Sequence, residues 1–213
     1  MENDTLKKFF ARNHFNFLKI NHERLLEYLS LLFEKNKVMN LVGKGDWEDL
    51  IEIHTRESLE LFPSLPQEIS TKQRMKVLDI GSGGGFPGII IGIVKPNWTI
   101  HLVESISKKA LFLSDVITEL KLTNVFVHHA RAEELVKDKR YINDFSLVMA
   151  RGVGKYSYLY PLFIQFLHKD GLMVFWKKYD EIFPSLKEYP AKITNQYFYP
   201  VSSGEKSILV LSL

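Results

Sequence analysis

Residues 77–88 read VLDIGSGGGFPG, and this stretch decides the fold. A short β-favouring run leads into a glycine cluster, and the apolar run 89–94 that follows predicts a helix. Glycines at 81, 83 and 85 let the backbone turn tightly and let a ligand approach it closely. The free amide groups at the start of the helix would point back at this turn. Strand, glycine turn and helix together predict a loop for a nucleotide-type cofactor.

Asp79 indicates which type of cofactor the loop would bind. It stands two positions before Gly81, where a carboxylate would repel a pyrophosphate and attract the positive amino-acid head of S-adenosylmethionine. The residues Gly83-x-Gly85-x-x-Gly88 also spell a dinucleotide fingerprint, which is weak by itself and is out of register here because the turn begins at Gly81. Nicotinamide binding, or a turn without ligand, stays open as an alternative.

The bulk composition excludes several classes of protein. With 213 residues and 46% hydrophobic residues, the chain suits one generous domain, or one domain with a small appendage. The absence of cysteine excludes disulfides and thiolate metal sites. The N-terminus lacks the apolar core of a secretion signal, and no run approaches the length of a membrane span, so we expect a soluble, cytoplasmic protein. A net charge of +3 permits a nucleic-acid partner without requiring one.

The chain divides into a helical part and an alternating part. Apolar residues at three-and-four spacing predict a helix around 25–35 and a second one over 47–61. We therefore expect an N-terminal helical extension over residues 1–62. Residues 63–74, with two prolines, predict a linker. A Rossmann-like domain is then expected over residues 75–213.

Strand and helix patterns alternate after residue 75. The predicted strands are Lys76–Ile80, Thr99–Glu104, Val125–His129, Phe145–Ala150 and Leu172–Trp176. The predicted helices between them are Gly88–Val94, Lys108–Leu120, Ala132–Val136 and Tyr158–Leu167. This alternation predicts an α/β fold with a parallel sheet covered on both faces. The last two runs, 193–199 and 207–211, are separated only by a turn, so we expect an antiparallel C-terminal hairpin.

Ligands of such sheets bind at the carboxyl ends of the strands, so the residues that follow each strand are candidates. Glu104 ends the second strand, 23 positions after Gly81, where a carboxylate can accept from both ribose hydroxyls; a solvated strand-end acid is the plainer interpretation. The corner at Ala132-Glu133 could meet an adenine edge, or Glu133 could be a helix N-terminal acid. Arg151 ends the fourth strand on the side of the transferable methyl group. It could hold a phosphate, stack on a base, pin the cofactor carboxylate or simply lie at the surface.

Metal and nucleophile chemistry find no support in the sequence. The seven histidines lack ligand spacing, and neighbouring His128 and His129 point to opposite faces of a strand. No serine stands in an elbow-type context. We therefore expect no metal site and no covalent catalysis.

Several motifs together resemble the ribosomal RNA small-subunit methyltransferase G family, also called glucose-inhibited division protein B. The similarity covers residues 38–180. The matching elements are Asn40-Leu41, His54-x-x-Glu57-Ser58-Leu59, the stretch 78–88, Glu104-Ser105-x-x-Lys108-Lys109-x-x-Phe112-Leu113, Asn124-Val125, Arg131-Ala132-Glu133-Glu134 and Arg151. The Phe-Pro-Gly after the turn and the serine–lysine–lysine element are more specific than the generic methyltransferase loop.

The resemblance implies a class I methyltransferase with a seven-stranded sheet that transfers methyl from S-adenosylmethionine to a guanine N7 of small-subunit ribosomal RNA. Carried over by position, the cofactor contacts would be Gly81, Phe86, Ala132, Glu133 and Arg151; our interpretation of the turn and the second strand adds Gly83 and Glu104. The chain departs from the family at four positions. Glu57 replaces an aspartate, Ala150 and Gly152 replace a serine and an alanine, and Lys178 replaces a glycine.

The implied reaction suits the absence of a general base, because guanine N7 carries a lone pair and no proton. We expect in-line alignment of nitrogen, methyl and sulfur to supply the rate. The target would be an unpaired guanine, because A-form RNA buries its major-groove edge. Its phosphates would be held by the cations Lys108, Lys109, Arg151, Lys155 and Lys177.

The expected partner is ribosomal RNA or the small ribosomal subunit, and we expect a monomer without metal. Three alternatives remain. They are a class I methyltransferase acting on another RNA or on a small molecule, a nicotinamide-dependent oxidoreductase, and a non-catalytic RNA-binding protein.

Overall fold

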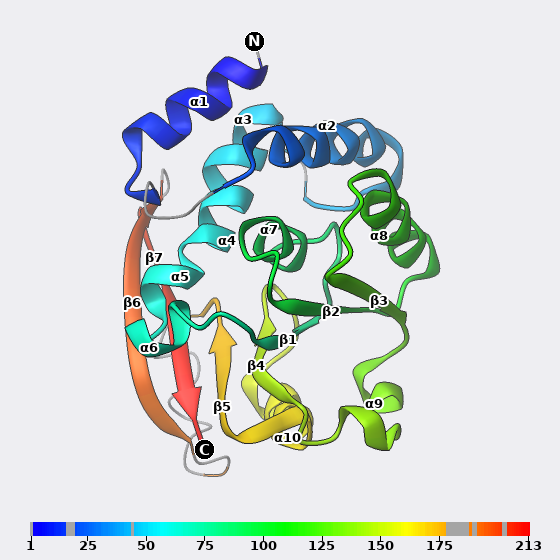
Figure 1. The fold of residues 1–213 in the computed structure, drawn as a ribbon, viewed down its shortest axis with the longest axis vertical. Coiled ribbons are helices and arrows are strands. Elements are labelled where there is room, and N and C mark those ends of the chain that lie inside the picture. Colours follow the sequence, from blue (N-terminus) through cyan, green and yellow to red (C-terminus); the bar gives the residue numbers. More distant parts are fainter. Residues whose placement is uncertain (1, 16–19, 44, 178–187, 189–190, 202–203) are drawn as a thin grey trace.

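The computed structural model describes residues 2–15, 20–43, 45–177, 188, 191–201 and 204–213. One seven-stranded sheet forms its centre, in the order β3-β2-β1-β4-β5-β7-β6 (Figure 1). The strands are β1 (Lys76–Ile80), β2 (Thr99–Glu104), β3 (Val125–His129), β4 (Phe145–Ala150), β5 (Leu167–Phe175), β6 (Lys192–Val201) and β7 (Gly204–Ser212). β1 to β5 are parallel, whereas β7 pairs antiparallel with both β5 and β6. The predicted α/β fold with its C-terminal hairpin is confirmed.

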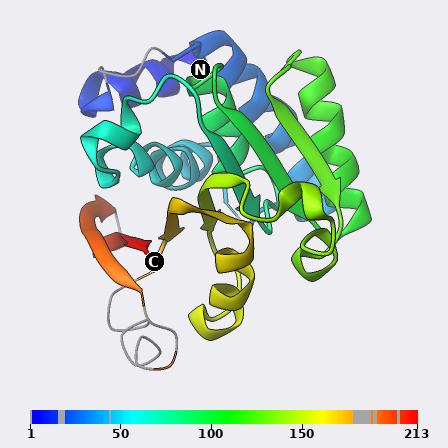
Figure 2. The same cartoon turned by 60° about the horizontal axis from the view of Figure 1, so that its bottom comes forward.

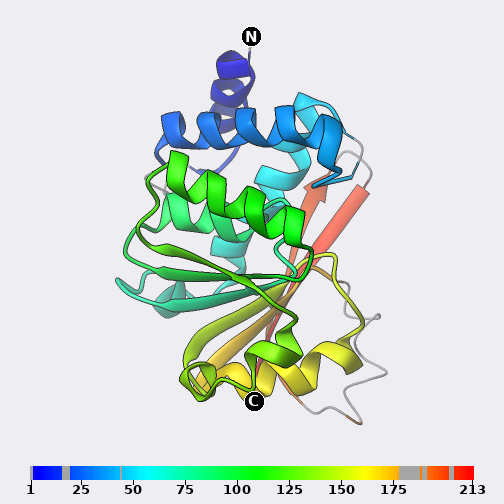
Figure 3. The same cartoon turned by 90° about the vertical axis from the view of Figure 1, so that its right-hand side faces the viewer.

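The central strands β1, β2 and β4 are buried along almost their whole length, because helices cover both faces of the sheet. α7 (Gly88–Val94) and α8 (Ser107–Glu119) lie on one face, and α9 (Ala132–Leu135) and α10 (Tyr156–Phe166) lie on the other (Figures 1 and 3). The chain proceeds from β1 outward to β2 and β3, then returns to the other side of β1 with β4. The carboxyl ends of β1 and β4 therefore form the switch point, where ligands of open α/β sheets bind.

The C-terminal hairpin extends the sheet beyond β5. In Figure 2 its orange and red strands lie at one edge of the molecule. Phe175 of β5 is opposite Leu209 of β7, and Tyr199 of β6 is opposite Lys206 of β7. β7 thus begins at the carboxyl end of β5. Its first residues therefore lie at the same end of the parallel strands as the switch point. Residues 202 and 203 of the predicted turn lie outside the described residues.

The N-terminal helices pack on the α7–α8 side of the sheet. They are α1 (Glu2–Arg12), α2 (His22–Met39), α3 (Trp47–Asp49), α4 (Arg56–Leu59), α5 (Leu61–Ser64) and α6 (Gln67–Ser70). A π-helical segment, η2 (Leu50–Thr55), lies between α3 and α4. Outside this group, a short 3₁₀ turn, η3 (Lys139–Tyr141), precedes β4. α2 begins at the N-cap Asn21, whose side chain accepts from the Arg24 amide, and ends at Asn40 in the left-handed conformation. It lies over α7 and α8 as an outer layer (Figure 3).

One hydrophobic core joins these helices to the sheet. Leu6, Leu29 and Phe62 belong to the same buried cluster as Val77 and Leu147. A second cluster lies under α10, around Leu78, Val148 and Phe163 on the other face of the sheet. The division into an extension over 1–62 and a domain over 75–213 stays a prediction. The hydrophobic core is continuous between these two parts of the chain. None of the described helices has the length and apolar character needed to cross a membrane.

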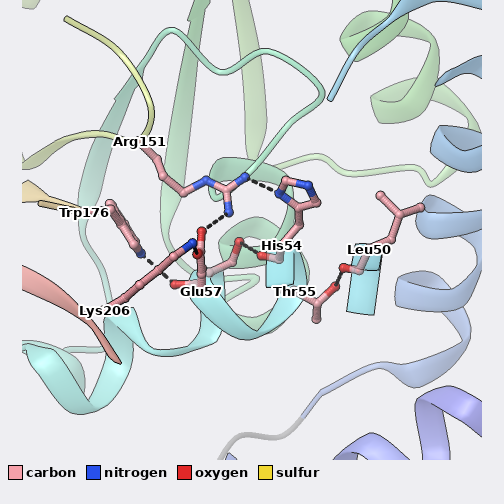
Figure 4. Close-up of polar contacts among 8 residues, drawn as sticks. Leu50, His54, Thr55, Glu57, Arg151, Trp176 and Lys206 are labelled. Carbon is pink, nitrogen blue, oxygen red and sulfur yellow. Dashed lines mark hydrogen bonds and ion pairs between the residues drawn. The ribbon is translucent and has the colours of Figure 1, made fainter. Parts of the chain in front are cut away.

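Two local predictions need correction. The expected linker, residues 63–74, includes the end of α5 and all of α6, because Leu65 and the half-buried Ile69 pack on the core. The expected helix over 47–61 is divided by η2, in which the Thr55 hydroxyl donates to the Leu50 carbonyl at 2.9 Å. Such π-helical turns are frequent at functional sites. Here the wide turn carries His54 toward the switch point (Figure 4).

Candidate functional site

The glycine turn begins directly after β1, as the sequence predicts. Gly81 and Gly83 have φ values of +74° and +56°, in the region that favours glycine. The Gly81 amide donates to the Val103 carbonyl at 2.8 Å, which ties the turn to the end of β2. A Cβ atom on Gly81 would lie 2.4 Å from Val153 Cγ2, in the segment after β4. The turn thus requires glycine for both its backbone conformation and its close packing.

Glu104 holds this turn in place. Its Oε2 accepts from the Gly83 amide at 2.9 Å, and its Oε1 accepts from the Ile106 amide at 2.8 Å. The residue is only 5% exposed, so its charge is directed into the site rather than into solvent. A carboxylate oxygen can accept more than one hydrogen bond, so both oxygens keep capacity for ligand hydroxyls.

Asp79 lies beneath the turn. Its Oδ2 accepts from the Gly88 amide at 3.1 Å at the start of α7, and its Oδ1 is buried with no partner among the described residues. Burial raises the pKa of Asp79 to about 7. An unpartnered carboxylate oxygen can accept from a cationic group, so Asp79 Oδ1 fits the ammonium of an amino-acid cofactor head.

The residues predicted to meet an adenine ring follow β3. Ala132 is buried at the start of α9. Glu133 accepts a hydrogen bond from the Tyr158 hydroxyl of α10, which lowers the pKa of the Glu133 carboxyl. The Ala130 amide donates to the Glu104 carbonyl at 3.2 Å, so this corner adjoins the end of β2. The adenine role of Ala132 and Glu133 stays a prediction.

Arg151 is the centre of a polar cluster at the end of β4 (Figure 4). Its Nη1 donates to Glu57 Oε2 at 2.9 Å, and its Nη2 lies 2.7 Å from His54 Nδ1. The guanidinium also lies over the Phe86 ring, 5.4 Å from its centroid. Glu57 Oε1 accepts from Lys206 Nζ at 2.5 Å. The arginine is therefore fixed on three sides, in contrast to a merely solvated surface arginine.

His54 is a neutral member of this cluster. Burial, with the neighbouring Arg151 and Lys206 charges, lowers the pKa of His54 to about 3. Because an arginine only donates, His54 Nδ1 accepts and the ring proton lies on Nε2. The imidazole stacks on Phe86 with the centroids 5.1 Å apart. The side chain thus orients Arg151 and Phe86 and carries no charge at neutral pH.

The structure brings some of the predicted substrate cations together and separates others. Lys177 lies after β5 and lines the same cavity as Arg151. Lys108 and Lys109 lie in the first turn of α8, which follows β2. Two strands, β1 and β4, separate β2 from β5, so these lysines lie apart from Lys177. Lys155 is exposed just before α10. Lys178 lies outside the described residues.

Sequence reasoning missed Lys206 and assigned no role to His54 and Glu57. These side chains come from η2, α4 and β7. Arg151, the partner of His54 and Glu57, is 97 and 94 positions away from them, and Lys206, the second partner of Glu57, is 149 positions from it. Only the family resemblance of residues 54–59 pointed to His54 and Glu57. Among the described residues, no group of three or more His, Cys, Asp or Glu side chains could hold a metal ion.

Comparisons with known proteins identify the family. The family model for rRNA small subunit methyltransferase G matches residues 21–209. The chain belongs to this family. A relative from Sorangium cellulosum, named Ribosomal RNA small subunit methyltransferase G, is 41% identical over 154 residues, which are 72% of this chain and 63% of the relative. A relative of the same name from Fusobacterium nucleatum is 35% identical over 196 residues, 90% of this chain and 82% of the relative.

The matched part of the chain spans less than two thirds of the length of the Sorangium cellulosum relative. Among solved structures, a SAM dependent methyltransferase from Aquifex aeolicus has a TM-score of 0.57 at 13% identity, covering 78% of this chain and 93% of that chain. At this identity the likeness concerns the fold alone. The fold is that of class I methyltransferases.

Proposed function

We propose that this protein transfers a methyl group from S-adenosylmethionine to N7 of a guanine in small-subunit ribosomal RNA. The observation that carries the proposal is the juxtaposition of the Glu104-bound glycine turn with the fixed Arg151 cluster at the switch point, in a member of this family. Relatives at 41% and 35% identity are named as ribosomal RNA small subunit methyltransferases, which supports methylation of this RNA.

The cofactor would be held by the residues at the ends of β1, β2 and β4. Asp79 and the turn at Gly81 and Gly83 fit its amino-acid part, and Glu104 would accept from its ribose hydroxyls. Ala132 and Glu133 are assigned to the adenine edge, and Phe86 and Arg151 to the side that faces the methyl group. When bound, S-adenosylmethionine supplies a methyl group whose C–S bond breaks as the C–N7 bond forms, leaving S-adenosylhomocysteine.

The protein groups around Arg151 suit a reaction without proton transfer. Guanine N7 has no proton to lose, and His54 stays neutral and accepts from Arg151, so no side chain needs to act as a general base. Positive charge moves onto the purine during the transfer. The Glu57 carboxylate, held against Arg151, offsets the repulsion that the guanidinium would otherwise exert on that charge.

The proposed substrate is an unpaired guanine, because N7 lies on the edge that A-form RNA buries. Lys177 lies beside the site, whereas Lys108 and Lys109 would bind phosphates at some distance along the strand. We propose that the protein acts as a monomer on ribosomal RNA or the small subunit in the cytoplasm.

The nicotinamide alternative is disfavoured by the topology. Dinucleotide-binding sheets have the parallel order 3-2-1-4-5-6. Here an antiparallel β7 stands between β5 and β6, and Asp79 lies under the turn.

The decisive experiment is nucleoside analysis of small-subunit ribosomal RNA from a strain that lacks this protein. Loss of one N7-methylguanosine, restored by the wild-type chain, is expected. Calorimetry with S-adenosylmethionine and with a nicotinamide dinucleotide tests the cofactor separately. Unchanged N7-methylguanosine would refute the substrate, and exclusive binding of the dinucleotide would refute the cofactor.

A further inference from the structure

A cavity of about 450 Å³ opens beside Arg151. It is lined by Arg151, Trp176, Tyr199, Lys206 and Glu57 among others, from the segments after β4 and β5, from α4 and from the β6–β7 hairpin. Its volume lies within the range of sites that accept small ligands. Because Arg151 contacts Phe86 of the glycine loop, the cavity adjoins the proposed cofactor site directly.

The charges at the cavity favour an anion. The Glu57 carboxylate is buried between two cations, Arg151 Nη1 at 2.9 Å and Lys206 Nζ at 2.5 Å (Figure 4). One negative charge against two positive charges leaves the cluster with a net positive charge, since His54 is neutral. Lys206 keeps a side-chain exposure of 45%, so its ammonium remains accessible at the rim.

The walls of the cavity suit a flat base. The Trp176 indole N–H donates to the Glu57 carbonyl at 2.8 Å, which fixes the ring and leaves its apolar surface for a ligand. Tyr199 is 1% exposed and lines the same cavity, yet its hydroxyl has no partner among the described residues. Burial raises the pKa of Tyr199, so the hydroxyl stays protonated and can donate. A buried hydroxyl left unpaired in the protein is unfavourable unless a ligand pairs with it.

We propose that this cavity receives the target nucleotide, with its purine between Trp176 and the Tyr199 hydroxyl and its phosphate on Lys206. Glu57 is then a positioning residue that holds Lys206 and Arg151 at the rim. This inference rests on the proposed function and names the substrate side of the same site.

The chemistry of N7 restricts what these groups can bind. A donor placed on N7 would occupy the lone pair that must attack the methyl group. The cations therefore serve the phosphate, and the Tyr199 hydroxyl serves another atom of the base edge. This division separates base recognition from phosphate binding, so the two can be tested independently.

The test uses the purified full chain and two variants, Tyr199→Phe and Lys206→Met. Lys192→Met is the matched control, because Lys192 is exposed at the opposite end of the hairpin, facing Ser212. Binding is measured with a single-stranded RNA oligonucleotide that carries one guanosine, and with the same oligonucleotide made abasic at that position. Calorimetry with S-adenosylmethionine and thermal unfolding are measured on every variant.

Tyr199→Phe is expected to weaken binding of the guanosine oligonucleotide about threefold to tenfold, the range for one neutral hydrogen bond, and to leave the abasic one unchanged. Its unfolding temperature should not fall, because the removed hydroxyl has no partner among the described residues. Lys206→Met is expected to weaken both oligonucleotides about equally. It should also lower the slope of log affinity against log salt by about 0.7, the value for one lost phosphate contact. Lys206→Arg should restore both.

The inference is overturned if Tyr199→Phe binds both oligonucleotides as the wild type does, or if Lys206→Met keeps the salt slope of Lys192→Met. These results leave S-adenosylmethionine binding and ribosomal RNA methylation by the wild type untouched. Failure of the wild type to bind S-adenosylmethionine would instead contradict the proposed function.

Discussion

Glu57 and Arg151 form a buried ion pair at 2.9 Å that joins α4 to the end of β4 across 94 positions of the sequence. The same carboxylate binds Lys206 of β7, so a single side chain connects the N-terminal helices, the switch point and the hairpin. Two cations at one site repel each other, and the carboxylate between them removes most of that repulsion. The geometry around Arg151 therefore depends on Glu57.

Glu57→Gln is expected to lower kcat/KM for RNA about tenfold, equivalent to about 1.4 kcal/mol of transition-state stabilisation. The amide keeps one acceptor for Arg151 and loses the charge that restrains both cations. Glu57→Asp, the residue usual in the family, should retain most of the activity. Steady-state kinetics with a ribosomal RNA substrate checks this. Glu52→Gln is the control, since Glu52 pairs with Arg12 and Arg56 and not with Arg151 or Lys206. Equal activity of Glu57→Gln and Glu52→Gln would contradict the prediction.

Glu104→Ala is expected to weaken S-adenosylmethionine binding at least tenfold. The change removes the acceptor of the Gly83 and Ile106 amides and the proposed ribose contact together. Charge-assisted hydrogen bonds of this kind contribute about 1.5–3 kcal/mol each. Calorimetry measures the dissociation constant, with exposed Glu119→Ala of α8 as the control. A dissociation constant within twofold of the wild type would exclude Glu104 from the cofactor site.

Much of the fold could be predicted from the sequence because its signals are local. The strand Lys76–Ile80 and the helix Gly88–Val94 are found with the predicted bounds, since an apolar run and a glycine turn delimit them. The hairpin is longer than predicted, at Lys192–Val201 and Gly204–Ser212, because its polar outer positions interrupt the apolar pattern. The helices within the expected linker are stabilised by packing against the core. The local sequence pattern does not indicate this packing.

The candidate site was predictable only on the side of the glycine loop. Glu104 follows Gly81 at a spacing that a βαβ unit enforces, so its contact with the turn could be anticipated. Lys206 and Tyr199 lie at the cavity because of the register in which the β6–β7 hairpin pairs with β5. This register depends on the strand order of the sheet, and no sequence motif indicates it. Their roles became visible only when three distant segments were placed together.

Gly81→Ala is expected to abolish measurable cofactor binding and to destabilise the protein. A left-handed backbone costs a non-glycine residue about 1–2 kcal/mol, and the new methyl group would also meet Val153. For a chain of this length the conformational cost lowers the unfolding temperature by roughly 2–8 °C. Scanning calorimetry measures it. Gly43→Ala is the control, because a Cβ there meets nothing within 4 Å. Adding Val153→Ala should restore part of the stability, and a wild-type unfolding temperature for Gly81→Ala alone would refute the argument.

Asp79 should make the stability of the free protein depend on pH. Its carboxyl ionises near pH 4 in the unfolded chain and at about 7 in the folded one. Between these values the folded state keeps a proton that the unfolded state has lost, so the free energy of unfolding falls as the pH rises from about 4 to about 7, and levels off above it. Asp79→Asn removes this contribution. Urea unfolding at pH 5 and pH 8 should show a smaller difference for the variant than for the wild type.

Binding of S-adenosylmethionine should reverse the preference of Asp79 for its proton. A cationic ammonium beside the orphaned Oδ1 favours the carboxylate, so binding below about pH 7 releases a proton and the affinity rises with pH up to that value. Calorimetry in two buffers of different ionisation enthalpy measures the released proton. Asp79→Asn should bind more weakly and release none. Equal proton release by the wild type and Asp79→Asn would show that another group, and not Asp79, responds to the cofactor.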